Sequence, residues 1–367
     1  MLDELEWPRL LSVPRLALAP HRVGLGFFAL LLLALLLQLA RAVGPRDWTP
    51  WREHAEATGE LATFLAAGDL VSSGAAFADL LLGASFRLLT DAPWSALVFF
   101  PPAFVVVALL GGAIARSVAC EFAQRVRLSW TESLAFSWQT GVALVGALVA
   151  PIAIVLLAGL GLGVLGWALF SLPWVNVVGA LLLPLGLLIA AFVVGFAFLL
   201  IAGHPMLLAS IACERTDAIE GVQRVLAYVV ARPLRLLLYS VLAIVQGLVV
   251  VAIFLGLAAA CVHFATAASS MFLDGPERGA LLGVDWVGRG WPVHVRTVAR
   301  LVNLWAAIPF LLVAGLAFSI VQASGVAIYL LLRRACDGQD VAEIWVPSML
   351  DGTFAPAVAR GEDEDES

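Results

Sequence analysis

The stretch "VNVVGALLLPLGLLIAAFVVGFAFLLI", from Val175 to Ile201, decides the fold class of this chain. It runs for 27 residues without an aspartate, glutamate, lysine or arginine. A helix needs about 20 consecutive, mostly apolar residues to cross the hydrocarbon core of a bilayer. The stretch therefore predicts a transmembrane helix.

Five further segments meet the same requirement of length and low charge. They are Val23–Val43, Ala96–Ala119, Leu134–Leu160, Leu234–Phe264 and Asn303–Leu332. Prolines lie inside three of the six segments, at Pro151, Pro184 and Pro309, and predict kinks rather than breaks because neighbouring helices satisfy the freed carbonyls. The sequence thus predicts an all-α integral membrane protein with about six transmembrane helices.

The composition agrees with a lipid environment. Of the 367 residues, 62% are hydrophobic and 13% are charged, whereas about one quarter of a soluble domain is charged. The net charge of −6 comes largely from the acidic end, Glu362–Glu366, and no basic patch with interleaved aromatic residues indicates nucleic-acid binding. The expected partners are membrane lipids, other membrane proteins or a second copy of the chain.

The arginines indicate the orientation. All 21 basic residues are arginine, and with the N-terminus inside, thirteen of them fall on the cytoplasmic side and eight on the other. This bias predicts a multi-pass protein of a bacterial inner membrane with both termini in the cytoplasm. The predicted parts are an N-terminal segment (1–22), a transmembrane bundle (23–334) and an acidic tail (335–367). The small residues at Ala40–Ala42 resemble a signal-peptide cleavage site, but the long apolar core favours an uncleaved anchor.

Two loops on the outer side are long enough to have structure of their own. Residues 45–93 contain two stretches whose apolar residues recur every three to four positions, so we expect two amphipathic helices. Residues 265–302 contain "HVRTVARLVNLW", which we expect to run directly into the last span. The uncharged connection Gly161–Trp174 is also expected outside.

A short motif occurs twice at an offset of 93 residues. "SVACEFAQRV" (Ser117–Val126) and "SIACERTDAI" (Ser210–Ile219) both follow a span that reaches the cytoplasmic side. Each is followed by a short amphipathic stretch and then by the next span. Because both copies lie on the same side, they predict a parallel internal repeat with interfacial elbow helices.

The motif offers a structural and a functional interpretation. Alanine and cysteine are small, so the helices can approach closely, and we expect Glu121 and Glu214 to favour the N-terminus of the next helix. Alternatively, Cys120 and Cys213 bind a metal or act as redox switches. The adjacent acids oppose thiolate formation and no histidine lies at ligand spacing, so the structural interpretation is preferred. The four cysteines, including Cys336, predict neither a disulfide framework nor a zinc site.

Few polar residues remain that could carry chemistry. His204 closes the fourth span, and Gln246 and Gln322 suit hydrogen bonds between helices, so we expect both amides to face other helices. No metalloprotease, serine-hydrolase or phosphate-loop motif is present, and we predict no catalytic residue, cofactor or bound metal. The candidate structural or functional cluster is Cys120, Glu121, His204, Cys213, Glu214, Gln246 and Gln322.

The connection "IACERTDAIEGVQRVLAYVVARPLR" and the spacing of the spans are similar to those of polytopic bacterial membrane proteins, including the membrane domain that accompanies some glycerophosphodiester phosphodiesterases. This resemblance implies an accessory membrane bundle without the catalytic domain of those enzymes. We expect a non-catalytic scaffold or accessory subunit of an inner-membrane complex. The alternative is a permease or lipid-handling protein for a neutral or lipidic substrate, favoured by the kinked spans and the repeat.

Overall fold

The protein is an all-α, multi-pass membrane protein. The computed structural model describes residues 7–282 and 292–346, and every regular element in those ranges is helical. Six helices in the described ranges are long and apolar enough to cross a membrane. In chain order they are α2 (Pro20–Val43), α6 (Pro93–Gln124), α8 (Gly141–Phe170), α9 (Val175–Gly203) continued by α10 (Leu207–Glu214), α12 (Pro233–Ser269) and α14 (Val293–Asp337).

The six predicted segments all lie in these helices, but the predicted bounds of the third were wrong. Residues Trp130–Gln139 form a separate helix, α7, and α8 begins only at Gly141. Ser129 starts α7 because its hydroxyl accepts from the Glu132 amide while the Glu132 side chain accepts from the Ser129 amide. The expected connection is also shorter, because α8 continues to Phe170 and leaves only 171–174 between the helices.

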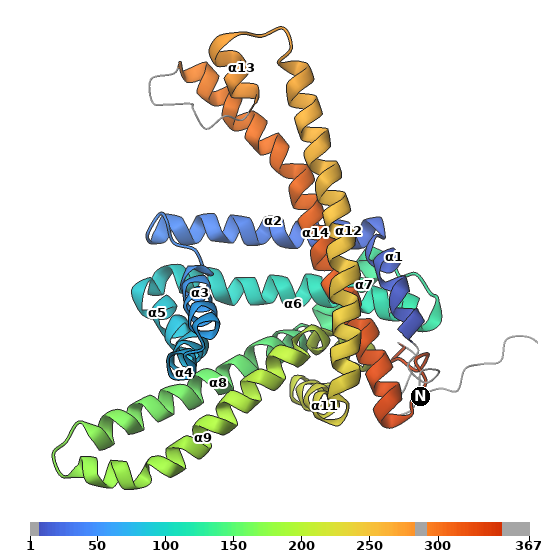
Figure 1. The fold of residues 1–367 in the computed structure, drawn as a ribbon. Helices are drawn as coiled ribbons and strands as arrows, with labels where there is room; N and C mark the ends of the chain where they lie inside the picture. Colours follow the sequence, from blue (N-terminus) through green and yellow to red (C-terminus); the bar gives the residue numbers. More distant parts are fainter. Residues whose placement is uncertain (1–6, 283–291, 347–367) are drawn as a thin grey trace, which may run out of the picture.

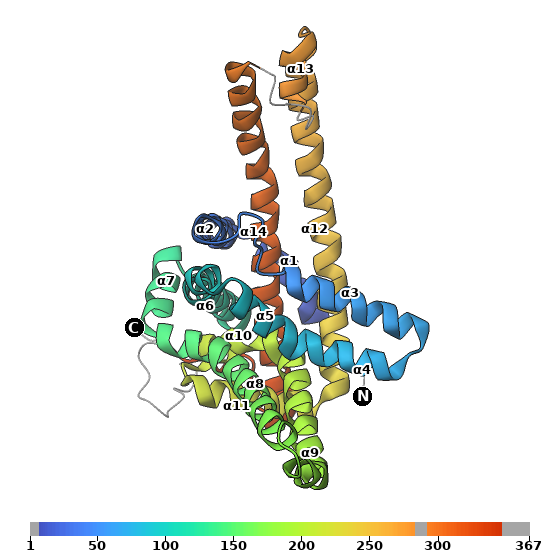
Figure 2. The same ribbon diagram turned by 90° about the vertical axis from the view of Figure 1, so that its left-hand side faces the viewer.

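Three helical hairpins diverge from one common region, which we call the hub. In Figures 1 and 2, α2 lies beside α6, α8 beside α9, and α12 beside α14, and the three pairs leave the hub in different directions. The first described helices and the segment after α14 also lie at the hub (Figure 1). The two ends of the described chain are therefore on the same side of the hairpins.

The largest buried apolar cluster is in the hub. It includes residues of α1 (Val13–Ala17), the hub ends of α6 and α14, α10, and the elbow helix α11 (Ala218–Ala231). A short 3-10 turn, η1 (Trp7–Ser12), leads into α1, and another, η3 (His204–Met206), joins α9 to α10. Gly325 of α14 lies so close to this second turn that a Cβ there would be 1.8 Å from the Pro205 carbonyl oxygen. Small residues thus permit the close packing that holds the hub together.

The loop between α2 and α6 folds into helices, as expected. It contains α3 (Arg52–Ala67), α4 (Leu70–Ala78), a π-helical turn (Asp79–Gly83, η2) and α5 (Ala84–Asp91). The Arg87 guanidinium on α5 donates to the Asp79 carboxylate at 2.6 and 2.7 Å and to Glu53 Oε2 at 3.1 Å. These ion pairs connect α3 to the α4–α5 arm.

The last span is longer than a bilayer requires. α14 has 45 residues, or about 68 Å at 1.5 Å per residue, against a hydrocarbon core of about 30 Å. It begins at Val293, so the expected continuous helix from "HVRTVARLVNLW" is confirmed. The helix α13 (Gly275–Leu281) packs against α14 at its far end (Figure 1).

The chain continues after α14 along the surface of the hub. Gly338 ends the helix with a φ of 71°, and Val341 and Ile344 are buried in the hub core. The Trp345 amide donates to the Cys213 carbonyl at 2.8 Å. The first part of the predicted tail is therefore packed against α10, and its acidic end, Glu362–Glu366, lies outside the described residues.

Candidate functional site

Three helices end together in the hub. α6, α10 and α14 are each followed by a residue with positive φ: Arg125 at 58°, Arg215 at 55° and Gly338 at 71°. The last four carbonyls of a helix have no partner within the helix, and its C-terminus carries partial negative charge. Three such ends in one place favour cations, and arginines occupy the hub.

Arg22, at the start of α2, is completely buried and binds the end of α6. Its guanidinium donates to the Ser117 hydroxyl at 2.9 Å, the Ser117 carbonyl at 3.0 Å and Glu121 Oε2 at 2.6 Å. It also donates to the Leu16 carbonyl of α1 at 2.6 Å. One buried cation therefore holds α1, α2 and α6 together. The Glu121 carboxylate neutralises it and also accepts from Arg127 at 3.1 Å.

Arg116 joins α6 to α10 and to the segment after α14. It is 3% exposed and donates to the Ala212 carbonyl at 2.9 Å and the Trp345 carbonyl at 2.7 Å. Its guanidinium lies 4.7 Å from the centre of the Phe136 ring and 5.4 Å from that of Trp345. No carboxylate pairs with Arg116 among the described residues, so carbonyl dipoles and aromatic faces stabilise its charge.

Arg333 of α14 is completely buried and makes the corresponding connection on the other side of the hub. It donates to Glu214 Oε1 at 3.3 Å and to the carbonyls of Asp340 and Glu343 at 3.0 and 2.5 Å. Glu214 also accepts from the Tyr329 hydroxyl at 2.5 Å and from Arg224. The buried Glu214 carboxylate is thus the acceptor at which α10, α11 and α14 meet.

The elbow helix α11 contributes a further polar contact. The Tyr228 hydroxyl donates to the Asp337 carboxylate at the end of α14. Burial, followed by the hydrogen bond and negative charge of Asp337, raises the pKa of Tyr228 above its usual value, so the phenol stays protonated and continues to donate.

The acids of the repeated motif do not lie where the sequence analysis expected them. Glu214 is the last residue of α10 and Glu121 lies in the last turn of α6, whereas the helices that follow are capped by Ser129 and Asp217. Side chains with a short reach cap a helix best, because the oxygen must return to an amide only two or three residues ahead. The two glutamates instead neutralise buried arginines.

The other predicted residues lie in different surroundings. Cys120 and Cys213 are buried in the hub core, and Gln322 is 8% exposed and lies against Gly111 of α6, facing another helix as expected. Gln246 of α12 has a covered amide that makes no hydrogen bond among the described residues. His204, in the turn η3, forms no hydrogen bond to either motif within the part of the chain that the structure describes, and it lines an apolar cavity of about 390 Å³ beside α8. The structure therefore brings the cysteines and glutamates together but leaves His204 apart from them.

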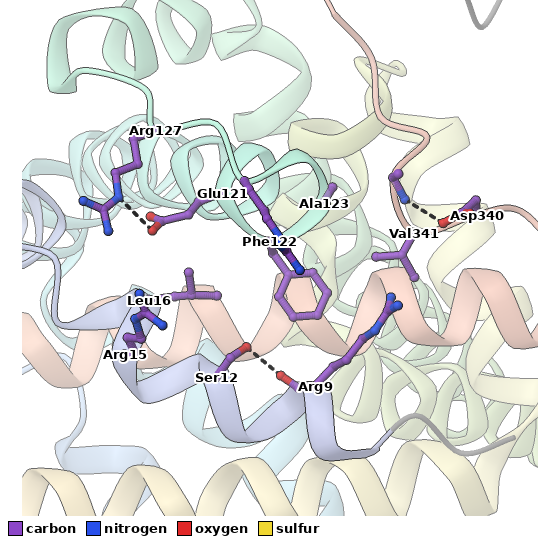
Figure 3. Close-up of a pocket in the computed structure, with 12 residues that line it drawn as sticks. Arg9, Ser12, Arg15, Leu16, Glu121, Phe122, Ala123, Arg127, Asp340 and Val341 are labelled. Atoms are coloured by element: carbon purple, nitrogen blue, oxygen red, sulfur yellow. Dashed lines mark hydrogen bonds and ion pairs between the residues drawn. The ribbon is translucent and has the colours of Figure 1, made fainter. Parts of the chain in front are cut away.

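The hub also contains an open polar cavity of about 730 Å³. Figure 3 shows residues of the N-terminal helices, the end of α6 and the segment after α14 arranged around it. Its charged lining residues are Arg9, Arg15, Arg125, Arg127, Glu121 and Asp340. Arginines therefore outnumber carboxylates among the described lining residues, and this part of the cavity is suited to an anion.

The sequence did not identify Arg22, Arg116 and Arg333 as site residues. They indicated only the orientation of the spans, although each lies near a span end where a buried partner is needed. The available signal was the concentration of arginines at one side of the predicted spans. Glu121 and Glu214 lie at span ends on that same side. In the described residues, no group of three or more histidine, cysteine, aspartate or glutamate side chains is arranged to hold a metal ion.

Comparisons with protein-family models, with characterised proteins and with solved structures found no match to this chain. The functional assignment therefore depends on the geometry of the hub, the hairpins and the cavity.

Proposed function

We propose that the protein is a non-catalytic membrane scaffold or accessory subunit that gathers partner proteins in a bacterial inner membrane. The observation that supports this proposal most directly is the divergence of the three hairpins from one end (Figures 1 and 2). Away from the hub, each hairpin has faces that no other described helix covers. Those faces are available to the helices of other membrane proteins.

The outer face of α9 illustrates the available surface. Leu181, Leu185, Leu188 and Phe192 recur every three to four residues, so they share one side of the helix. Their exposed fractions are 80, 58, 69 and 70%. Lipid chains are as apolar as these side chains, so a partner helix must gain its affinity from close packing rather than from the hydrophobic effect alone. A regular ridge of large side chains provides such a packing surface.

The hub supplies the rigidity that a scaffold needs. Arg22, Arg116 and Arg333 each connect two or more helices through several hydrogen bonds, and Glu214 receives three donors. Removing one member of such a network leaves an uncompensated buried charge, so the helices separate only at considerable cost. The hairpins are therefore fixed relative to one another at their bases.

The orientation and the duplication are parts of the same proposal. The excess of arginines at the hub end favours the cytoplasm for that end and for both termini. A parallel internal duplication is supported by the similar order of elements after α6 and α10. In each case an arginine with positive φ is followed by a capped short helix, α7 or α11, and then by the next span.

Site-specific photo-cross-linking in native membranes tests the scaffold proposal. A photoreactive residue at Leu188, on the outer face of α9, should cross-link to one recurring protein, identified by mass spectrometry after mild purification of the full chain. The matched control is Val193, which is 7% exposed on the opposite side of α9 and should give no such product. If Leu188 yields only lipid adducts while a single lipid copurifies, the scaffold proposal is overturned.

A permease or lipid-handling role is the second candidate. Two apolar cavities have volumes of about 390 and 320 Å³, and Pro205 lines both of them. The first lies beside α8 and the second between α12 and α14. Volumes of this order accommodate small apolar ligands or part of an acyl chain. Enrichment of one lipid with the purified protein, lost on filling the second cavity by Ser324→Phe, would favour this candidate.

A further inference from the structure

We propose that the polar cavity of the hub binds a phosphate group, either as the headgroup of an anionic phospholipid or as part of a small phosphorylated compound. The proposal is independent of the scaffold function, since it concerns the hub surface and not the outer faces of the hairpins. The cavity of about 730 Å³ lies between η1–α1, the end of α6 and the segment after α14 (Figure 3).

The charge of the lining carries the argument. Among the described lining residues, Arg15 and Arg125 carry charges that no described carboxylate neutralises, whereas the Glu121 carboxylate is already neutralised by Arg22 at 2.6 Å and Arg127 at 3.1 Å. Asp340 accepts from the Ala342 amide at 3.0 Å. An anion entering the cavity therefore meets a positive field, with little repulsion from Glu121.

Two of the arginines are available for a ligand. The side chains of Arg15 and Arg125 belong to exposed residues, and neither guanidinium makes a hydrogen bond or ion pair with the described residues. Arg125 also occupies the left-handed region, which a residue with a Cβ enters at some cost. The planar guanidinium donates two parallel hydrogen bonds to a phosphate, which a lysine ammonium does not.

The position of the cavity admits both sources of phosphate. It is lined by η1 and α1, which lead into α2, and by the last turn of α6, so it lies at a face that two spans reach. Leu16, Phe122 and Val341 add apolar surface beside the arginines, as the carbon backbone of a phospholipid or phosphoester requires. The shared chemistry is thus a phosphate anion attached to a short carbon framework.

Native mass spectrometry of the full chain in nanodiscs provides the first arm of the test. Discs of phosphatidylcholine with phosphatidic acid should give a complex with retained phosphatidic acid. The double variant Arg15→Gln/Arg125→Gln should retain at least about tenfold less, because both guanidinium groups that donate charge-assisted hydrogen bonds to the phosphate are lost. Arg232→Gln, which removes an exposed arginine at the same end but outside the cavity, should behave as the unsubstituted protein.

The second arm uses calorimetric titration with inorganic phosphate in discs of phosphatidylcholine alone. Saturable binding that the double variant loses, without selective retention of phosphatidic acid, assigns the cavity to a soluble phosphorylated compound. Retention without phosphate binding assigns it to a lipid headgroup. The proposal is overturned if neither probe binds, or if the folded double variant, with an unchanged melting temperature, binds both as well as the unsubstituted protein.

Discussion

Gly26 of α2 and Gly315 of α14 meet where the two helices cross. A Cβ on Gly26 would lie 2.2 Å from the Gly315 carbonyl oxygen, and a Cβ on Gly315 would lie 2.5 Å from the Phe27 amide nitrogen. Backbone atoms leave no room for any side chain here, because they cannot rotate away as a flexible side chain does. The contact ties the first span to the last, and only glycine permits it.

We therefore expect Gly315→Leu to displace α14 from α2 and to lower both the yield and the melting temperature of the purified protein. Gly24→Leu is the matched control, since no atom lies within 4 Å of a Cβ at Gly24. The measurement is fluorescence-detected size exclusion across a temperature series. Equal stability of the two variants would show that the helices do not cross at these glycines.

The sequence predicts the spans well because the length of an apolar segment can be read from consecutive residues. It predicts the crossing of α2 and α14 poorly because a contact between two helices depends on residues far apart in the chain. Gly26 and Gly315 are 289 positions apart, and nothing in either segment distinguishes them from Gly24, where a Cβ would have open space around it. The same reason explains the third span. Leu134–Leu160 contains no charged residue, but the capping box at Ser129 starts a separate helix, which ends at the polar residues Gln139 and Thr140.

The candidate site shows a similar division. The repeated Ala-Cys-Glu motif correctly indicated two buried cysteines beside two acids, because both copies end a span at the same face. Two of the arginines that pair with those acids, Arg22 and Arg333, come from α2 and α14, far away in the chain, whereas Arg127 and Arg224 lie within ten residues of the acid that each binds. The pairing of Arg22 and Arg333 depends on the tertiary arrangement, and one sequence without its fold cannot reveal it.

Glu214→Gln should destabilise the hub strongly. The substitution keeps the size of the side chain but removes the charge that neutralises Arg333, and an uncompensated buried charge costs about 3–5 kcal/mol. Glu220→Gln is the control, because Glu220 pairs with the same Arg224 at 2.6 Å but is half exposed, where ion pairs contribute about 0–1 kcal/mol. Chemical denaturation in detergent micelles measures both. A similar loss of unfolding free energy in the two variants would mean that the Glu214 network does not stabilise the hub.

Trp345→Ala should release the segment after α14. The ring stacks on Arg215 at 4.4 Å and on Arg116 at 5.4 Å, so its removal withdraws two cation–π contacts of about 0.5–2 kcal/mol each. We expect faster cleavage of this segment in limited proteolysis, with the rest of the protein unchanged. Trp167→Ala, which removes an exposed tryptophan from α8, should leave the cleavage rate as it was.

The double substitution Cys120→Ala/Cys213→Ala should leave the protein folded. Both thiols pack as small apolar groups, so each loss costs about 1 kcal/mol of buried surface and removes no hydrogen bond made by a thiol among the described residues. Abundance should fall only slightly, and the metal content by elemental analysis should not change. A metal present in the parent protein and absent from the variant would support the alternative role of the thiols.

The helices between α2 and α6 should loosen in acid. The hydrogen bonds from Arg87 hold the pKa of Asp79 below its usual value, so the folded form binds this proton less readily than the unfolded form. Such a contribution is complete above the unfolded pKa, near about 4, and disappears as the pH falls through the lower folded value. The protection factors of residues 52–91 in hydrogen exchange, which are corrected for the intrinsic pH dependence of amide exchange, should therefore be high at pH 7 and at pH 5 and should fall at pH 3. Arg87→Gln should lower the protection factors already at pH 7 and remove most of their pH dependence. Protection factors that fall equally in both proteins between pH 5 and 3 would assign the acid sensitivity to another carboxylate.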